Sequence, residues 1–90
     1  MPKLYQIILC GNVQDVGFRW AAKEKADSLK IRGEIKNLPD GTLYIEAEGE
    51  EYQLRPYLDW CRKGPMFARV KTIDVKEAAP KNYPDFKIIE

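Results

Sequence analysis

The segment from Gly11 to Arg19 combines residue types that can bind a phosphate group. It reads GNVQDVGFR, with two glycines and with an arginine where an amphipathic helix is predicted to begin. Glycine permits positive φ angles and close backbone approach, and the first N–H groups of a helix have no partner within the helix. Such N–H groups attract an anion, and the guanidinium of Arg19 could bind two of its oxygens. The same residues also fit a solvated arginine that follows an ordinary turn.

Asn37 is a second polar candidate, at the end of a segment in which apolar and polar residues alternate. The alternation places Asn37 on the same face of the predicted strand as Gly33 and Ile35. From the end of that strand it could face the glycine-containing loop. An amide can both donate and accept hydrogen bonds, as the positioning of a water molecule requires. Asparagine is also frequent in turns, and Pro39–Asp40–Gly41 follows, so a turn residue is the open alternative.

The composition excludes several classes of function. The chain has 90 residues, no histidine and a formal net charge of +1. Without histidine there is no imidazole base, no Ser–His or Cys–His pair and no histidine-ligated zinc. The small net charge creates no global field that would attract nucleic acid or an anionic membrane, so an anion must be bound by local donors. We therefore expect no nucleic-acid and no membrane partner.

The length predicts one globular domain, residues 1–90, because two hydrophobic cores cannot be built from so short a chain. Cys10 and Cys61 match no metal-binding spacing and are predicted to be buried free thiols. The sequence shows no signal-peptide pattern and no apolar stretch near the roughly 20 residues of a membrane span. We expect a cytoplasmic protein, and nothing suggests more than a monomer.

Hydrophobic periodicity predicts the elements that position the two candidate sites. Apolar residues at helical spacing predict one helix from Phe18 to Leu29 and another from near Gln53 to Lys63. The second start is chosen so that Pro56 lies in the first turn, where its missing N–H has no intrahelical partner anyway. Strands are predicted at 5–10, buried on both faces, at 31–37 and 43–48 as a hairpin, at 70–75 with a bulge or with both faces partly covered, and at 86–89. The fold class is α+β, a ferredoxin-like βαββαβ sandwich with an antiparallel sheet and two helices on one face.

Two motifs in the chain resemble those of the acylphosphatase family. The pattern G-x-V-Q-x-V-G-F-R, from Gly11 to Arg19, looks like the signature loop of that family. The pattern G-x-I-K-N, from Gly33 to Asn37 and followed by Asp40-Gly41, resembles its second motif. Weaker similarity continues to Phe86, so the resemblance covers nearly the whole chain.

The resemblance implies hydrolysis of acyl phosphates to a carboxylate and inorganic phosphate, with no metal and no cofactor. It implies that Arg19 is essential, that Asn37 orients the attacking water, and that inorganic phosphate binds as product or inhibitor. A leaving carboxylate with a pKa near ~4 to 5 needs no general acid, which suits a chain without histidine. The residues that the resemblance assigns to substrate binding are Gln14, Asp15, Val16, Gly17, Phe18 and Arg19.

Asp15 departs from the family pattern, which usually has glycine at this position of the loop. A carboxylate about 6 Å from the bound phosphate would repel it by roughly 3 kcal/mol at an effective dielectric near 20. A side chain that points to solvent would be screened, and one that pairs with Arg19 would have to be displaced by substrate. Aspartate tolerates a left-handed backbone, so the loop shape could survive. The alternative function is a catalytically weak or inactive phosphate-binding module.

Lys30 is a second departure, because the family commonly has a glycine there that closes the first helix. A left-handed backbone at Lys30 would cost about 1 to 2 kcal/mol. This difference affects stability rather than mechanism.

Overall fold

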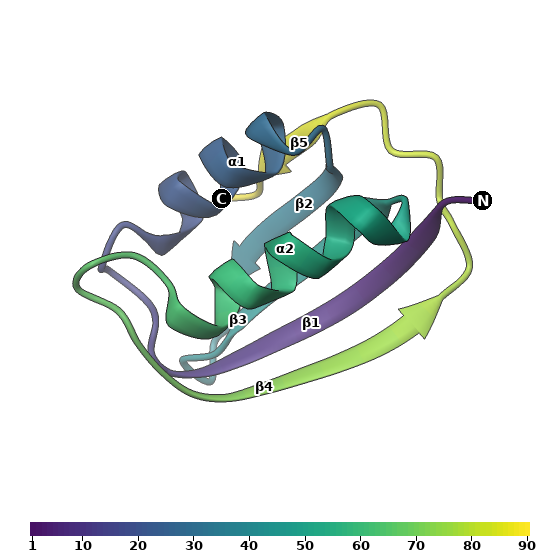
Figure 1. Cartoon of the computed structure of the whole chain (residues 1–90). Helices are drawn as coiled ribbons and strands as arrows, with labels where there is room; N and C mark the ends of the chain where they lie inside the picture. Colours follow the sequence, from purple (N-terminus) through teal and green to yellow (C-terminus); the bar gives the residue numbers. More distant parts are fainter.

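A computed structural model describes all residues, Met1 to Glu90, and consists of one five-stranded sheet and two helices (Figure 1). The sheet order is β4-β1-β3-β2-β5, and both helices cover the same face. This arrangement confirms the predicted ferredoxin-like α+β fold. The elements are β1 (Lys3–Asn12), α1 (Phe18–Ser28), β2 (Arg32–Asn37), β3 (Leu43–Gly49), α2 (Glu51–Lys63), β4 (Arg69–Ala78) and β5 (Phe86–Ile88).

The fifth strand makes the sheet mixed, so the expectation of an antiparallel sheet is wrong at one edge. The pairs β1–β3, β1–β4 and β2–β3 are antiparallel, but β5 pairs in parallel with β2. The chain leaves β4 at one edge of the sheet and crosses to the opposite edge through residues 79–85 (Figure 1). Since this crossing stays at one end of the strands, β5 must run opposite to β4, which is the direction of β2.

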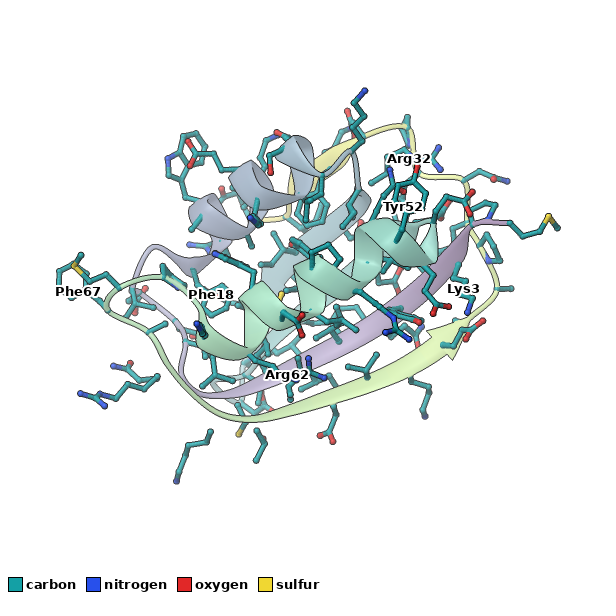
Figure 2. All side chains as sticks on the ribbon, viewed as in Figure 1. Lys3, Phe18, Arg32, Tyr52, Arg62 and Phe67 are labelled. Carbon is teal, nitrogen blue, oxygen red and sulfur yellow. The ribbon has the colours of Figure 1, made fainter.

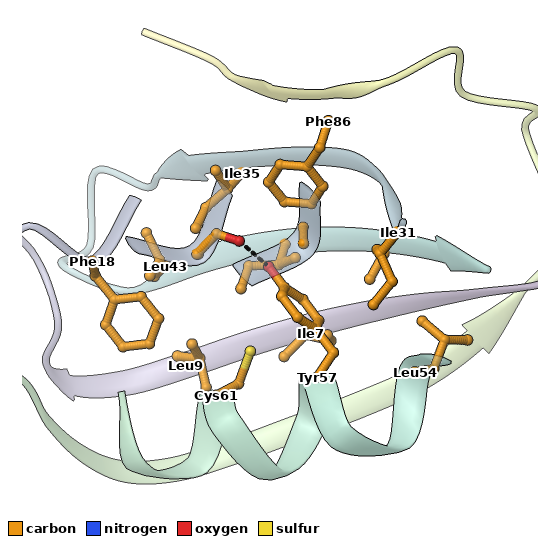
Figure 3. Packing of buried hydrophobic residues seen from close by; sticks show 14 of the residues in the cluster. Ile7, Leu9, Phe18, Ile31, Ile35, Leu43, Leu54, Tyr57, Cys61 and Phe86 are labelled. Atoms are coloured by element: carbon orange, nitrogen blue, oxygen red, sulfur yellow. Dashed lines mark hydrogen bonds between the residues drawn. The ribbon is translucent and has the colours of Figure 1, made fainter. Parts of the chain in front are cut away.

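The hydrophobic core lies between the helices and the covered face of the sheet (Figure 3). Inside it, the hydroxyl of Tyr57 donates a hydrogen bond to the carbonyl of Ala22 at 3.0 Å, which gives this buried polar group a partner. Burial raises the pKa of the Cys61 thiol to about 12. Large buried side chains from every helix and from four strands fill this core: Phe18 of α1, Leu54 and Tyr57 of α2, Ile7 and Leu9 of β1, Ile35 of β2, Leu43 and Ile45 of β3, and Phe86 of β5.

Two predictions about β1 are wrong, namely that it is buried on both faces and that Cys10 is buried. Because the helices cover only one face, β1 is not buried on both sides, and Ile8 is 38% exposed. Cys10 is exposed as well, whereas Cys61 is buried as predicted. Of the two alternatives predicted for the fourth strand, the bulge is present, since the pairing of β1 with β4 shifts register between Cys10 and Gly11, opposite Thr72 and Val70.

Helix α2 begins at Glu51, two residues before the predicted start. A capping box accounts for the earlier start, because the backbone N–H of Glu50 donates to the side chain of Gln53 at 2.7 Å and the side chain of Glu50 accepts the N–H of Gln53. Pro56 therefore lies inside the helix rather than in its first turn. Its missing N–H leaves the carbonyl of Tyr52 without a helical donor, but both residues are exposed and solvent can serve that carbonyl. Neither helix is long and apolar enough to cross a membrane.

Two buried carboxylates on the uncovered face hold the segment that crosses from β4 to β5. Glu46 accepts hydrogen bonds from the hydroxyls of Tyr44 and Tyr83 and from the ammonium of Lys81. Glu48 is 0% exposed and accepts the backbone N–H groups of residues 81 and 82 at 3.0 Å. Arg32 lies at the start of β2 (Figure 2), and its Nη2 is 3.5 Å from the Glu48 carboxylate. These contacts fix the path that carries β5 to the edge of the sheet.

Candidate active site

A cavity of about 240 Å³ lies where the loop between β1 and α1, the end of β2 and the C-terminal segment meet. It brings together the two candidate sites of the sequence, Arg19 and Asn37. The predicted strand alternation is confirmed here, since Ile35 is in the core and Asn37 borders the cavity on the same face. Its lining consists of Val13, Asp15, Gly17, Phe18, Arg19, Trp20, Asn37, Ile88 and Glu90.

The loop between β1 and α1 adopts the backbone shape that its glycines and Asp15 permit. Asp15 has φ 60° and Gly17 has φ 77°, so both residues are left-handed. The loop shape therefore survives the replacement of the usual glycine by aspartate. No side chain caps the N-terminus of α1, so the N–H groups of its first turn are available to an anion.

Both ends of this loop are anchored in the core. Val13 and Phe18 are each 1% exposed, and the ring of Phe18 packs edge-on against Trp60 with centroids 5.5 Å apart. Phe18 points inward beneath α1 in Figure 2, while the loop between its two anchors faces the cavity. The N–H groups of this loop and of the first turn of α1, here called the phosphate cradle, are thus held in place by core packing at both ends of the loop.

Arg19 is the only cationic residue in the cavity lining, which also contains two acidic residues, Asp15 and Glu90. Its Nη1 lies 3.7 Å from Oε1 of Glu90, a side chain that is 88% exposed. Asp15 forms no ion pair with Arg19, so the predicted possibility of that pair is wrong, and Glu90 takes that place. Asp15 is exposed, which allows solvent to screen its charge.

Asn37 carries the one buried side-chain polar atom that has no hydrogen-bond partner in the protein, its amide oxygen Oδ1. A buried acceptor without a partner costs about 1–3 kcal/mol, so this oxygen lowers the free energy of unfolding. Asn37 is the last residue of β2 and is paired with Leu43 of β3, which holds its backbone in place. Asn37 lines the cavity, and its amide oxygen has unused capacity to accept hydrogen bonds.

Gln14 and Val16 do not line the cavity with their side chains. The amide Nε2 of Gln14 instead donates to the carbonyls of Leu38 and Thr42, at 2.8 and 2.9 Å. Val16 packs against the hydrophobic core. Of the six residues assigned to substrate binding, Asp15, Gly17, Phe18 and Arg19 therefore border the cavity, and the other two could contribute only through their backbone.

Comparison with known proteins agrees with the motifs on the two sides of this cavity. A sequence model of the family described as Acylphosphatase matches residues 5–88. The chain belongs to the acylphosphatase family. An acylphosphatase of Lactiplantibacillus plantarum is 47% identical over 79 residues, which cover 87% of this chain and 88% of that protein. One of Archaeoglobus fulgidus is 45% identical over 83 residues, with coverage of 92% and 93%.

A solved acylphosphatase structure supports the same assignment. The crystal structure of acylphosphatase from Bacillus subtilis matches this chain with a TM-score of 0.95 and 36% identity over 100% of both chains. The resemblance inferred from the two motifs is thereby confirmed for the family and for the fold.

The residues of the acylphosphatase cavity that the sequence did not reveal are Val13, Trp20, Ile88 and Glu90. Trp20 is 68% exposed at the cavity and follows Arg19 directly. Ile88 pairs in register with Ile35, two residues before Asn37. Continued by two residues, this register places residue 90 beside Asn37. A prediction of the parallel pairing of β5 with β2 would therefore have identified residue 90 as a neighbour of Asn37.

Proposed function

We propose that this acylphosphatase binds the phosphoryl group of its substrate in the loop from Gln14 to Arg19 and that Asn37 orients the attacking water. The reaction of the family is hydrolysis of an acyl phosphate to a carboxylate and inorganic phosphate. One observation carries the assignment of residues to this reaction. A single cavity is lined by Gly17 at the uncapped start of α1, by Arg19 and by Asn37, whose amide oxygen has no hydrogen-bond partner in the protein.

The binding step uses fixed donors. The N–H groups of the loop and of the first turn of α1 donate to phosphoryl oxygens, and Arg19 adds two charge-assisted hydrogen bonds. Phosphoryl transfer spreads negative charge over the equatorial oxygens, and donors already in position stabilise that charge without reorganisation. Catalysis of this kind depends on placement and charge, which suits a cavity without histidine.

The hydrolytic step begins with a water molecule that donates a hydrogen bond to Oδ1 of Asn37 and directs a lone pair at phosphorus. A bond forms between the water oxygen and phosphorus as the bond from phosphorus to the acyl oxygen breaks. The electron pair of that bond leaves with the carboxylate, and the proton of the water passes to the phosphate product. Because the leaving carboxylate has a pKa of about 4 to 5, it needs no proton from the enzyme.

The alternative of an inactive phosphate-binding module is not supported. It rested on Asp15, whose carboxylate is exposed and unpaired with Arg19 and whose backbone adopts the left-handed shape of the loop. The relatives at 45% and 47% identity are acylphosphatases, and this chain matches them over most of their length. We further propose a cytoplasmic monomer, which size-exclusion chromatography with light scattering would test. The small net charge supports the absence of nucleic-acid and membrane partners, because it creates no global field that would attract them.

Hydrolysis of benzoyl phosphate at neutral pH, in the presence of a chelator, tests the activity and the role of Arg19. We expect turnover by the natural protein that persists in chelator. Replacement of Arg19 by alanine should lower kcat/KM by two orders of magnitude or more, since a charge-assisted contact in the transition state is lost. An Arg19→Ala variant that hydrolyses benzoyl phosphate as fast as the natural protein would contradict the proposal.

A further inference from the structure

Gln14 connects the two halves of the candidate active site. Its amide Nε2 donates two hydrogen bonds, to the carbonyl of Leu38 at 2.8 Å and to that of Thr42 at 2.9 Å. Gln14 belongs to the phosphate-binding loop, whereas Leu38 and Thr42 flank the turn between β2 and β3. This side chain therefore joins two segments that lie 24 and 28 residues apart in the chain.

The carbonyls that Gln14 binds belong to the tightest part of the hairpin. The N–H of Leu38 donates to the carbonyl of Thr42 at 2.9 Å, and the N–H of Gly41 donates to the carbonyl of Leu38 at 3.1 Å. Asp40 closes the same turn, because its carboxylate accepts the backbone N–H of Thr42 at 3.0 Å. With Gln14 added, each of the two carbonyls accepts two hydrogen bonds, which is its full capacity. The turn is thus a rigid unit, and Gln14 attaches it to the loop.

Asn37 is the residue directly before this unit. Since Leu38 is one peptide bond away, the hydrogen bond from Gln14 to the Leu38 carbonyl restrains the place of Asn37 relative to the loop. The loop itself does not depend on Gln14, because Val13 and Phe18 anchor its two ends in the core. Because Asn37 is paired with Leu43 in the same hairpin, loss of the Gln14 amide should shift the end of the hairpin and Asn37 together away from the phosphate cradle, while the cradle keeps its shape.

We propose that Gln14 is a positioning residue, whose side-chain amide sets the distance between the phosphate-binding loop and the amide of Asn37. Its side chain does not touch substrate, although the family motif places it within the binding loop. This inference rests on the proposed function, because it concerns the alignment of the water that Asn37 holds. A displacement of about 1 Å in such an alignment can reduce a rate about a hundredfold.

The test compares Gln14→Leu with Gln6→Leu. Leucine has nearly the same size as glutamine but donates no hydrogen bond. Gln6 also donates from its amide Nε2, here to the Glu46 carboxylate at 3.3 Å on the uncovered face of the sheet, and Glu46 keeps three other donors without it. With benzoyl phosphate, Gln14→Leu should lower kcat at least tenfold, while the inhibition constant for inorganic phosphate changes less than threefold. Gln6→Leu should leave both constants unchanged.

A second variant gives a readout that loss of stability alone would not produce. In Gln14→Glu, a carboxylate faces the two carbonyl oxygens at neutral pH and repels them, whereas the protonated carboxyl group can donate one hydrogen bond. The carbonyl dipoles raise the pKa of such a group. The kcat of Gln14→Glu divided by that of the natural protein should therefore rise as the pH falls from about 8 to about 5.

Three results separate the proposals. No turnover by the natural protein would contradict the proposed function itself. Turnover by the natural protein with an unchanged kcat in Gln14→Leu would overturn the role of Gln14. A parallel loss of kcat and phosphate binding in Gln14→Leu, with a flat pH ratio for Gln14→Glu, would show that Gln14 maintains the loop and does not position Asn37.

Discussion

Removal of the charge of Asp15 should strengthen the binding of inorganic phosphate. The carboxylate stands in the loop that is proposed to bind phosphate and borders the same cavity as Arg19. Its backbone is left-handed, with φ 60°, and asparagine tolerates this conformation as well as aspartate does. Asp15→Asn therefore removes the charge and keeps the loop, whereas Asp15→Gly also removes the side chain.

The size of the effect follows from the exposure of Asp15. At about 6 Å and an effective dielectric near 20, a full charge would weaken phosphate binding by roughly two orders of magnitude. Because Asp15 is exposed, water and salt screen most of this repulsion. We expect the inhibition constant for phosphate to fall about two- to fivefold in Asp15→Asn at low ionic strength.

Competitive inhibition of benzoyl phosphate hydrolysis by inorganic phosphate, at about 20 mM and about 500 mM salt, measures this effect. The Debye length falls from roughly 20 Å to roughly 4 Å between these conditions, so the advantage of Asp15→Asn should largely disappear at high salt. Asp15→Gly should show the same salt dependence if charge is the cause. An inhibition constant that is unchanged or higher in Asp15→Asn at low salt would show that the charge of Asp15 does not weaken phosphate binding.

Three further changes have defined outcomes. Glu90→Gln should lower the phosphate inhibition constant about twofold at low salt, because it removes the carboxylate 3.7 Å from Arg19, and no change would show that this exposed pair is too weak to matter. Burial raises the pKa of Glu46, but its hydrogen bonds from Tyr44, Tyr83, Lys81 and Gln6 outweigh burial and lower it to about 2. Above pH 4.5, the pKa of Glu46 in the unfolded chain, the ionised carboxylate therefore adds about 3 kcal/mol to the free energy of unfolding. This contribution is lost as the pH falls towards 2. Urea unfolding at several pH values should show this loss in the natural protein and not in Glu46→Gln. Lys30→Gly should stabilise the protein by about 0.5 to 1 kcal/mol, because it relieves a left-handed backbone at φ 61°, and a lower free energy of unfolding would contradict that explanation.

Local residue types were sufficient to predict the parts of the site that depend on backbone shape. Gly17 was expected to permit a positive φ before a helix and Asp15 to tolerate a left-handed backbone, and both residues have positive φ. The alternation from Gly33 to Asn37 predicted that Asn37 shares a face with the core residue Ile35 and lies at the strand's end. Both inferences succeeded because they concern short segments, in which periodicity and φ preference decide the conformation.

Features that depend on segments distant in sequence were not predicted. The parallel pairing of β5 with β2 arises from the crossing segment, which is held by Glu46 and Glu48 on the uncovered face. No local pattern reveals that crossing, so Glu90 was not recognised as the partner of Arg19. The role of the Gln14 side chain was missed for the same reason, since its acceptors lie 24 and 28 residues away.

In the proposed mechanism, the unpartnered oxygen of Asn37 holds the attacking water while the loop and Arg19 hold the phosphate. Measurement of kcat for benzoyl phosphate and of the phosphate inhibition constant in Asn37→Ala separates these two roles. We expect kcat to fall at least a hundredfold and phosphate binding to change less than threefold, because only the water loses its partner. A variant that retains its kcat, or one that loses phosphate binding in proportion to kcat, would show that Asn37 does not hold the water.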